Sequence, residues 1–489
     1  MRKRARFPKT FALFLGLTIF SGCGGSYPSM TTPPRADFAL NVSPSSIFVP
    51  IGAGSSSLQL SVKALNGFNP PVTISVTGLP SGVSTTPNSP FTVNVGASQT
   101  VVFSATNGMQ PNLQQISFQG AAGTLSHSFP VSVSVANPVY AYVPSGYTDG
   151  VTNFPPNDIA GFAVDANTGA ITAVPGAPTS LPNPPLDIAV ASEPGGAFIF
   201  ALTSDGTTLG ARTLSSFKVD PATGSLAAVQ TISPLSGTVQ LNLAVHPAGK
   251  FLYVTQQGCI QAYVIDPATG HLTQSLCSPQ LPSGPFVIAP PGDFAYTATN
   301  SDLNGQMLIY SVNQNDGSLT LLNSLPAWEP NSTLVSDPLG RALYQLGSPF
   351  TIQDCGGHFF IWTIDPNTGL VTQVTTSFGP PLCIPYSITF TPDDGFGYVN
   401  AKGIYAGAVD PSSGNLTNVP GSPFAASSGY NVVEPTQGKF LIGIGGVSEL
   451  QLVDYTIDPS TGALSQVSGV GTPFTSTFPF KMVMVAPPH

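Results

Sequence analysis

Two stretches of this chain carry the residue types that could move a proton or hold an anion. The stretch "GSPFTIQDCGGHFF" (347–360) contains Asp354 and His358, and "TSDGTTLGAR" (203–212) ends in Arg212. A histidine titrates near neutral pH, and an arginine can hold a developing negative charge. If the chain is a catalyst, we expect His358, Asp354 and Arg212 to do the chemistry. The alternative is that both stretches are ordinary solvated loops.

Several common catalytic and metal-binding signatures are absent from the sequence. There is no G-x-S-x-G elbow, no H-E-x-x-H, no P-loop and no G-x-G-x-x-G after a strand. The cysteines have no C-x-x-C spacing, and His358 alone is not a ligand set for zinc. We therefore expect no metal and no cofactor.

Composition favours an all-β chain of more than one domain. The 489 residues contain 51 Gly and 50 Pro, whereas only 8% of residues are charged. Such a chain is rich in turns and poor in helix formers, and its length calls for two or more hydrophobic cores.

The first 22 residues have the pattern of an export signal. Five of the fourteen basic residues precede the apolar run "FALFLGLTIF", which is too short to span a bilayer as a mature helix. The following "FSGCGGS" resembles the lipobox of bacterial lipoproteins, which implies cleavage before Cys23 and acylation of that cysteine; a plain secreted protein is the alternative. We expect residues 1–22 to be a signal peptide and residues 23–37 a lipidated tether at the cell envelope.

Net charge excludes one class of partner. Without residues 1–22 the chain has 9 basic and 23 acidic side chains, a net charge of about −14. Nucleic acid is a polyanion and needs a basic surface, so we expect no nucleic-acid partner. The partners that remain are a membrane, through Cys23, and a glycan, peptide or protein ligand. We expect the protein to be a monomer.

Residues 38–136 show the alternating pattern of short β-strands. About seven β-branched segments, such as "LQLSVKAL" and "VTISVTG", are separated by turn signals near every ten residues, which predicts a β-sandwich. The phrases "GLPSGVSTTP" and "GAAGTLSHSFPVSVSV" resemble the immunoglobulin-like modules appended to many secreted bacterial enzymes and adhesins. Such modules usually serve as spacers.

Residues 138–489 contain the same turn seven times, each copy between two apolar segments. The copies are "VDANTGAI" (164–171), "VDPATGSL" (219–226), "IDPATGHL" (265–272), "VNQNDGSL" (312–319), "IDPNTGLV" (364–371), "VDPSSGNL" (409–416) and "IDPSTGAL" (457–464). Their spacing is that of a four-stranded propeller blade. In each copy the Asp or Asn at the second quoted position is the first residue of the turn and caps it, and Gly supplies a positive φ.

A second repeated phrase lies midway between these turns, as in "HPAGKFLYV" (246–254) and "EPTQGKFLI" (434–442). With both phrases in register, the chain resembles the seven-bladed β-propellers of the lactonase family (6-phosphogluconolactonase-like, with YVTN-type repeats). The repeats begin in mid-blade, so we expect the last segment, "FKMVMVAPPH", to complete the first blade. Both repeated turns should lie on one face, which makes His246 and Glu434 turn residues and leaves the longer loops on the opposite face.

The resemblance also implies where a ligand would bind. Lactonase-type propellers carry "P-R-H" or "P-H" where the chain begins an inner strand, whereas this chain has Leu186, Phe286 and Tyr386 at the matching places. Lactone hydrolysis is therefore in doubt, and we expect an apolar or aromatic channel mouth. The residues that we expect to contact a ligand are Phe286, Tyr386, Asp302, Glu329 and Lys402.

Four cysteines besides Cys23 fit an oxidising compartment. Cys259 and Cys277 are symmetric about the third turn, so a hairpin in register would place them opposite each other, and we expect a disulfide. Cys355 and Cys383 flank the fifth turn less symmetrically, and we expect them to pair as well.

Two functions remain open. The first is an exported, lipid-anchored propeller that binds a glycan, peptide or protein through its loop face without catalysis. The second is a hydrolase of a sugar lactone, which follows from the family resemblance.

Overall fold

A computed structural model gives the fold of the chain. It describes residues 35–51, 55–106, 109–110, 112–136, 138–148, 153–204, 212–235, 242–256, 258–279, 284–298, 305–326, 333–347, 358–376, 378, 387–401, 403–424, 430–445, 451–467, 472–473 and 481–486. Within these residues every regular element is a strand, and no helix is long and apolar enough to cross a bilayer.

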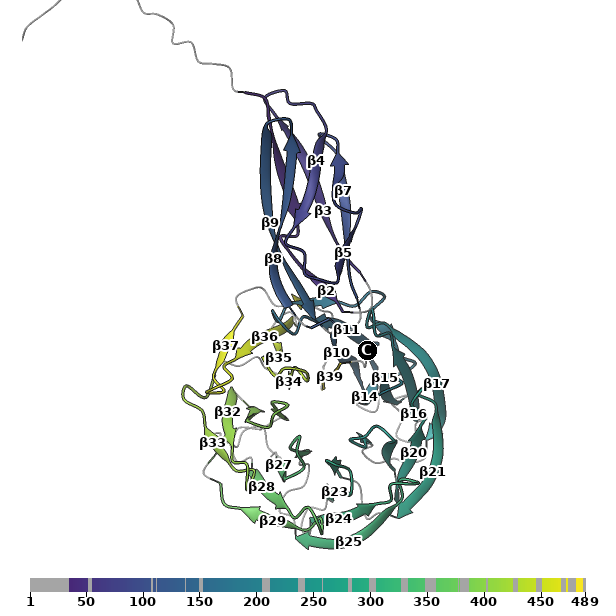
Figure 1. Cartoon of the computed structure of the whole chain (residues 1–489). Coiled ribbons are helices and arrows are strands. Elements are labelled where there is room, and N and C mark those ends of the chain that lie inside the picture. Colours follow the sequence, from purple (N-terminus) through teal and green to yellow (C-terminus); the bar gives the residue numbers. More distant parts are fainter. Residues whose placement is uncertain are drawn as a thin grey trace, which may run out of the picture.

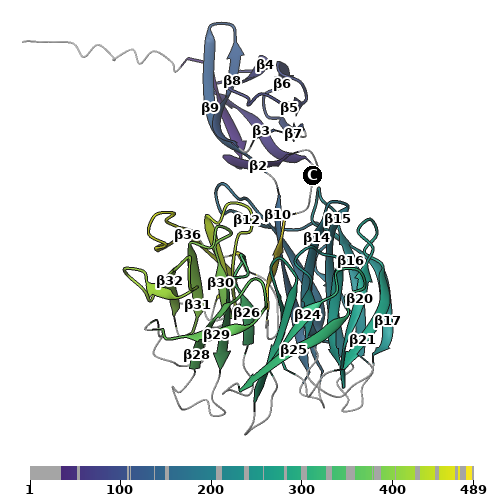
Figure 2. The same ribbon diagram turned by 60° about the horizontal axis from the view of Figure 1, so that its bottom comes forward.

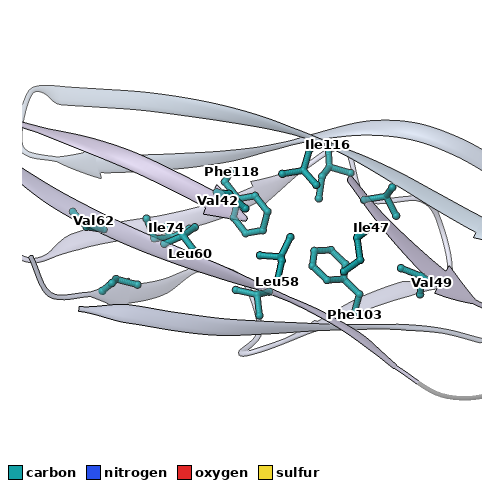
Figure 3. Packing of buried hydrophobic residues seen from close by; sticks show 14 of the residues in the cluster. Val42, Ile47, Val49, Leu58, Leu60, Val62, Ile74, Phe103, Ile116 and Phe118 are labelled. Carbon is teal, nitrogen blue, oxygen red and sulfur yellow. The ribbon is translucent and has the colours of Figure 1, made fainter. Parts of the chain in front are cut away.

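The N-terminal unit consists of two sheets packed on a shared core (Figure 3). The first sheet has the order β1 (Asp37–Ser43), β3 (Ser56–Leu65), β7 (Ser98–Ala105) and β5 (Val83–Thr86). The second has the order β2 (Ser46–Pro50), β9 (Leu125–Ala136), β8 (Asn112–Ala122), β4 (Val72–Thr77) and β6 (Phe91–Val93). Alternate residues such as Leu60 and Val133 are fully buried, and the rings of Phe103 and Phe118 lie 6.4 Å apart. The unit is a β-sandwich.

Seven further sheets form a ring of blades (Figure 1). Blade 1 contains β10 (Val139–Thr148), β11 (Asn153–Val164), β12 (Ile171–Ala173), β13 (Thr179–Ser180) and β39 (Val483–Val485). Blade 2 contains β14 (Pro185–Glu193), β15 (Gly196–Ser204), β16 (Arg212–Val219) and β17 (Leu226–Leu235). Blade 3 contains β18 (Leu243–Val245), β19 (Phe251–Gln256), β20 (Cys259–Ile265) and β21 (Leu272–Pro279).

The remaining four blades repeat this pattern. Blade 4 contains β22 (Phe286–Ala289), β23 (Phe294–Ala298), β24 (Gln306–Val312) and β25 (Leu319–Pro326). Blade 5 contains β26 (Thr333–Ser336), β27 (Ala342–Gly347), β28 (His358–Ile364) and β29 (Val371–Val374). Blade 6 contains β30 (Ser387–Phe390), β31 (Phe396–Asn400), β32 (Ile404–Val409) and β33 (Leu416–Asn418). Blade 7 contains β34 (Asn431–Val433), β35 (Phe440–Gly445), β36 (Gln451–Ile457), β37 (Leu464–Gln466) and β38 (Thr472–Pro473).

The end of the chain closes the ring, as the repeat pattern predicts. β39 pairs antiparallel with β10, so that Tyr140 lies opposite Val485 and Tyr142 lies opposite Val483. The innermost strand of blade 1 therefore comes from the last residues of the chain. The ring is a seven-bladed β-propeller.

The glycine of each recurring turn packs against the preceding blade. In all seven turns the Gly N–H donates to the carbonyl of the first turn residue at 2.8 to 2.9 Å, and the Gly φ lies between +68° and +76°. A Cβ at Gly224 would lie 2.4 Å from the ring of Tyr140, on the second strand of the preceding blade. The other six turn glycines meet the equivalent residue of their preceding blade in the same way. Glycine is thus needed both for its conformation and for the close contact between blades.

Tyrosine hydroxyls reinforce four of these contacts. In four blades the second strand also carries a buried tyrosine two residues after the residue that contacts the turn glycine. The hydroxyl of this tyrosine donates to the carbonyl of the same glycine, in the next blade. The pairs are Tyr142 to Gly224 (2.6 Å), Tyr296 to Gly369 (2.9 Å), Tyr344 to Gly414 (2.6 Å) and Tyr398 to Gly462 (3.0 Å). Burial raises the pKa of each of these phenols well above its ordinary range.

A disulfide joins Cys259 and Cys277, whose Cα atoms are 5.7 Å apart. The two residues are not directly opposite each other, because Cys259 pairs with Pro279 and Cys277 pairs with Gln261. A register shift between Gln261 and Tyr263 offsets the hairpin from the symmetric arrangement that the sequence suggests. The bond therefore crosses the strand pair diagonally.

Candidate functional site

The two faces of the propeller differ in how their strands are connected. In blades 2 to 7 the first and second strands are joined at one face, which we call the turn face, and the third and fourth strands of all seven blades are joined at that same face. The opposite face, the loop face, carries the connections between the second and third strands and between blades. Each inner strand begins at the loop face. We call the end of the central channel there the loop-face mouth; Lys481, Asp187 and Ser387 mark the beginnings of three inner strands around it.

A buried carboxylate links three blades at this mouth. Asp187 Oδ1 lies 2.7 Å from Lys481 Nζ, just before β39, and accepts a hydrogen bond from Ile188 N at 2.8 Å. Its other oxygen, Oδ2, accepts from Leu243 N in blade 3 at 2.7 Å. The Asp187 side chain is 11% exposed and that of Lys481 is 36% exposed. The lysine is therefore the part of the pair that a ligand can reach.

Two buried acceptors lie in blade 1, near the start of β14. Neither Asn157 Oδ1 nor Asp158 Oδ1 has a hydrogen-bond partner among the described residues. Burial raises the pKa of the Asp158 carboxyl. A Cβ at Gly146, where φ is +117°, would lie 2.8 Å from Asn157 Oδ1 and 3.3 Å from Pro185 Cδ, so these groups border the start of β14.

Blade 6 contributes a second set of buried polar groups at the loop-face end of its strands. Asn400, the last residue of β31, is fully buried and pairs in register with Ser387, the first residue of β30. Asn400 Nδ2, Asn400 Oδ1 and Ser387 Oγ all lack a partner within the described part of the chain. Buried polar atoms without partners are costly, so such a group marks a place that a polar ligand or ordered water can complete.

The turn-face end of the channel is also hollow, and the two polar side chains that border its cavities hold local turns. It contains cavities of about 400 and 370 Å³, bordered by Asp337 and His246 respectively. Asp337 Oδ1 accepts from Arg341 N and Ala342 N. The His246 Nδ1 accepts from Ala248 N at 3.1 Å, and its Nε2 lies 3.2 Å from the Gly292 carbonyl oxygen. Burial lowers the pKa of this histidine, which therefore stays neutral.

His246 and Glu434 are turn residues, as predicted. Glu434 is fully buried and accepts hydrogen bonds from the N–H groups of Thr436, Gln437 and Gly438 within its own turn. Each side chain uses its polar atoms to hold a turn. Neither is a candidate for catalysis.

The predicted ligand residue Phe286 belongs to the core. It is 7% exposed, and its ring centroid lies 5.5 Å from that of Tyr253. The alternation along β22 turns this side chain into the packing between blades and not toward a ligand. Phe286 therefore does not make the mouth aromatic, and the polar groups described above are what the structure places there.

Arg212 lies at the loop-face end of the third strand of blade 2, whereas Asp158 lies within β11, the third strand of blade 1, opposite Ser145. Arg212 is the first residue of β16, pairs with Ser204 and is half-buried. His358 begins β28 opposite Gly347, although its side chain lies outside the described part. The predicted site residues Asp302, Glu329, Asp354, Tyr386 and Lys402, the lipidation residue Cys23, and the cysteines Cys355 and Cys383 also lie outside the described residues.

Sequence reasoning missed Asp187, Lys481 and Asn400. Each lies in an apolar segment that reads as a propeller strand, "NPPLDIAV", "FKMVMV" and "FGYVN". An alignment of the seven repeats could have found them. At each of these positions, near the loop-face end of a strand, one repeat has a polar residue where other repeats have an apolar one. Among the described residues, no group of three His, Cys, Asp or Glu side chains could hold a metal ion.

Comparisons with known proteins support the fold. Residues 156–288, from β11 to β22, match the family model "Lactonase, 7-bladed beta-propeller". No curated protein shows significant sequence similarity to the chain. Among solved structures, a protein of Bacteroides uniformis ATCC 8492 provisionally assigned as a 6-phosphogluconolactonase has a TM-score of 0.55 and 19% identity, covering 71% of this chain and 100% of its own.

Two further structures have similar scores. A protein of Bacteroides fragilis NCTC 9343 with the same provisional assignment has a TM-score of 0.54 and 17% identity, covering 71% of this chain and 98% of its own. The periplasmic gluconolactonase of Pseudomonas aeruginosa has a TM-score of 0.51 and 17% identity, covering 72% of this chain and 100% of its own. At these identities the likeness shows a shared fold.

Proposed function

We propose that this lactonase-type seven-bladed propeller binds a polyhydroxylated, carbohydrate-type ligand at its loop-face mouth. The observation that carries the proposal is the set of buried polar atoms in Asn157, Asp158 and Asn400 that have no partners among the described residues, together with the Lys481 ammonium at the mouth. A sugar supplies closely spaced hydroxyl groups that donate and accept, which matches a site with carbonyl, carboxyl and amide groups.

The balance of charge at the mouth argues for a neutral or weakly anionic ligand. Asp187 already offsets Lys481, and burial favours the neutral form of Asp158. Among the described residues of the mouth, a strongly anionic group would find one partly exposed lysine, and a strongly cationic group would find Asp187 already paired with that lysine. The hydroxyl groups of a sugar could donate to the side-chain oxygens of Asn157, Asp158 and Asn400 and accept from Lys481 Nζ.

Hydrolysis of a sugar lactone is the second candidate function. It is supported by the family match over residues 156–288 and by the environment of Asp158, a carboxyl whose pKa is raised by burial, as is common for a general acid. Asp187 has a different environment, because its two oxygens lie against Lys481 Nζ and two backbone N–H groups. Two carboxyl groups in unlike environments are a common arrangement for acid and base roles.

Calorimetry and a pH-stat assay test both candidates on the same protein. We would titrate the full-length chain with neutral sugars and with open-chain aldonates, and follow hydrolysis of glucono-δ-lactone in parallel. Asn400→Leu should abolish sugar binding. Asn418→Leu, on the exposed outer strand β33 of the same blade, should leave binding unchanged.

The outcomes separate the two functions. Saturable sugar binding without turnover supports the binding protein. Turnover that is lost in Asp158→Asn but not in Asn418→Leu supports the hydrolase. If neither binding nor turnover occurs, the carbohydrate proposal is wrong, and a peptide or protein partner for the loop face takes its place.

We further propose that the protein is exported and held at the cell envelope through Cys23. The signal-like first 22 residues support this location, as does the disulfide between Cys259 and Cys277, because such bonds persist in oxidising compartments. Cys23→Ser should move the protein from the membrane fraction to the soluble exported fraction. Recovery of the parent chain in the cytosol with reduced cysteines would contradict the proposal.

A further inference from the structure

The turn of blade 1 is the only one of the seven equivalent turns whose first residue is buried. Asp165 is 3% exposed. The equivalent residues of the other six turns are exposed: Asp220, Asp266, Asn313, Asp365, Asp410 and Asp458. Because the seven turns share their backbone geometry, the difference must come from something that covers the first turn.

The covering element is β9, the last strand of the sandwich. Ser134 Oγ donates to Asp165 Oδ1 at 2.9 Å, and both residues are buried. Asn167 Nδ2 donates to Ser134 Oγ at 3.1 Å and to the Val135 carbonyl at 3.2 Å. Three hydrogen bonds therefore join the sandwich to one propeller turn; the bond between Ser134 and Asp165 is buried and the two from Asn167 are partly buried, and loss of such bonds on undocking is costly.

The sequence of this turn is adapted to the contact. Five of the other turns have proline at their second position, whereas the first has Ala166, which is 1% exposed. Asn167 has a counterpart in blade 5, Asn367, at the same place in the repeat. Asn367 is exposed, and its described hydrogen bond is from its own N–H to Asp365 Oδ1. Asn167 makes the same backbone bond to Asp165 Oδ1, and its side chain makes the docking contacts in addition.

We propose that the turn of residues 165–170 is a docking site for the sandwich, and that this joint makes sandwich and propeller one rigid body. The chain enters β10 at the turn face, so the sandwich stands on that face beside blade 1 (Figure 2). The joint therefore holds the loop-face mouth on the side of the propeller that faces away from the sandwich.

The joint also fixes the direction of the mouth relative to the start of the chain. Arg35 donates to Thr124 Oγ1 at the tip of the β8–β9 hairpin, at the opposite end of β9 from Ser134. The strand between Thr124 and Ser134 separates these two contacts by roughly 35 Å. This step rests on the proposed function, in which Cys23 anchors the protein to a membrane. The sandwich is then a rigid spacer that holds the loop-face mouth on the side away from that membrane.

Small-angle X-ray scattering and hydrogen exchange on the full-length chain test the joint without a ligand. The scattering of the unaltered protein should fit a single arrangement of the two units. The double variant Ser134→Ala with Asn167→Ala should broaden the distance distribution and accelerate amide exchange in residues 131–136 at least tenfold. Asn367→Ala, the matched change in blade 5, should alter neither measurement.

Two results would overturn the inference. One is scattering of the unaltered protein that requires many orientations of the sandwich. The other is a double variant whose scattering and exchange match those of Asn367→Ala. Should the double variant fail to fold, Asn167→Asp provides a second test, because it places a carboxylate beside Asp165 and the Val135 carbonyl. Neither result depends on sugar binding, so failure of the joint and failure of the proposed function are distinguishable.

Discussion

Lys481 Nζ lies 2.7 Å from Asp187 Oδ1, although 294 residues separate the two in sequence. The contact forms because β39 completes blade 1 next to β14 of blade 2. Ring closure and the candidate site are therefore built by the same strand. A change that loosens the closure should also disturb the loop-face mouth.

The two partners of this ion pair should differ in their effect on stability. Lys481→Met should lower the free energy of unfolding by less than about 1 kcal/mol, because the lysine is partly exposed and solvent screens the pair. Asp187→Ala should cost about 1–3 kcal/mol, because it leaves the Ile188 and Leu243 N–H groups without their acceptor. Urea unfolding of both variants checks this. Equal losses would show that the charge, and not the backbone capping, is what matters.

The turn glycines should be intolerant of alanine beyond the usual conformational cost. Gly224→Ala places a Cβ 2.4 Å from the Tyr140 ring, whereas Gly176 has a similar positive φ and open space around it. Gly176→Ala should cost about 1–2 kcal/mol from backbone strain alone. We expect Gly224→Ala to cost at least twice as much, measured by thermal unfolding. A cost no larger than that of Gly176→Ala would mean that the neighbouring blade yields without penalty.

The hydroxyls of equivalent tyrosines should contribute unequally to the free energy of unfolding. Tyr398→Phe removes the hydrogen bond to the Gly462 carbonyl and should cost about 1 kcal/mol. The equivalent hydroxyl of Tyr253 is buried and has no partner among the residues that the structure describes, so Tyr253→Phe should be neutral or stabilising. Parallel urea titrations of the two variants give the comparison. A loss in Tyr253→Phe equal to that in Tyr398→Phe would contradict it.

One buried carboxyl should make stability depend on pH near neutrality. Burial, followed by the neighbouring Asp337, raises the pKa of Asp394 from 3.8 to about 7, although Arg341 also contacts it. The folded state holds this proton more tightly than the unfolded state. The contribution of Asp394 to stability is thus complete below about pH 4 and is lost as the pH rises toward 7. Relative to Asp394→Asn, the parent chain should lose stability over this range.

An exposed turn carboxyl, whose pKa is lowered and not raised, provides a control with the opposite dependence of stability on pH. Hydrogen bonds from Ser460 and Thr461 lower the pKa of Asp458 to about 2. Its contribution is therefore present above the unfolded pKa of 3.8 and is lost as the pH falls toward 2. Urea unfolding of Asp394→Asn and Asp458→Asn between pH 2.5 and 7.5 should give difference curves of opposite slope. Curves of the same sign would refute the assignment for Asp394.

The repeated turns predict most of the propeller because each repeat is a local unit. The Asp, Gly and Thr of "DPATG" make their hydrogen bonds within five residues, so their spacing alone indicates seven hairpins and the face on which they lie. The mid-blade start of the repeats likewise predicts that the last segment pairs with β10.

The sequence by itself determined the all-β class, the seven blades, the closing strand and the disulfide partners Cys259 and Cys277. Only the tertiary structure decided that Phe286 faces the core, that Asp187 meets Lys481, and that Asp165 alone among its seven equivalents is covered. The physical reason is the range of the interactions. Turn formation depends on neighbours in sequence, whereas the burial and pairing of a polar side chain depend on which distant strand the closed ring and the docked sandwich bring against it.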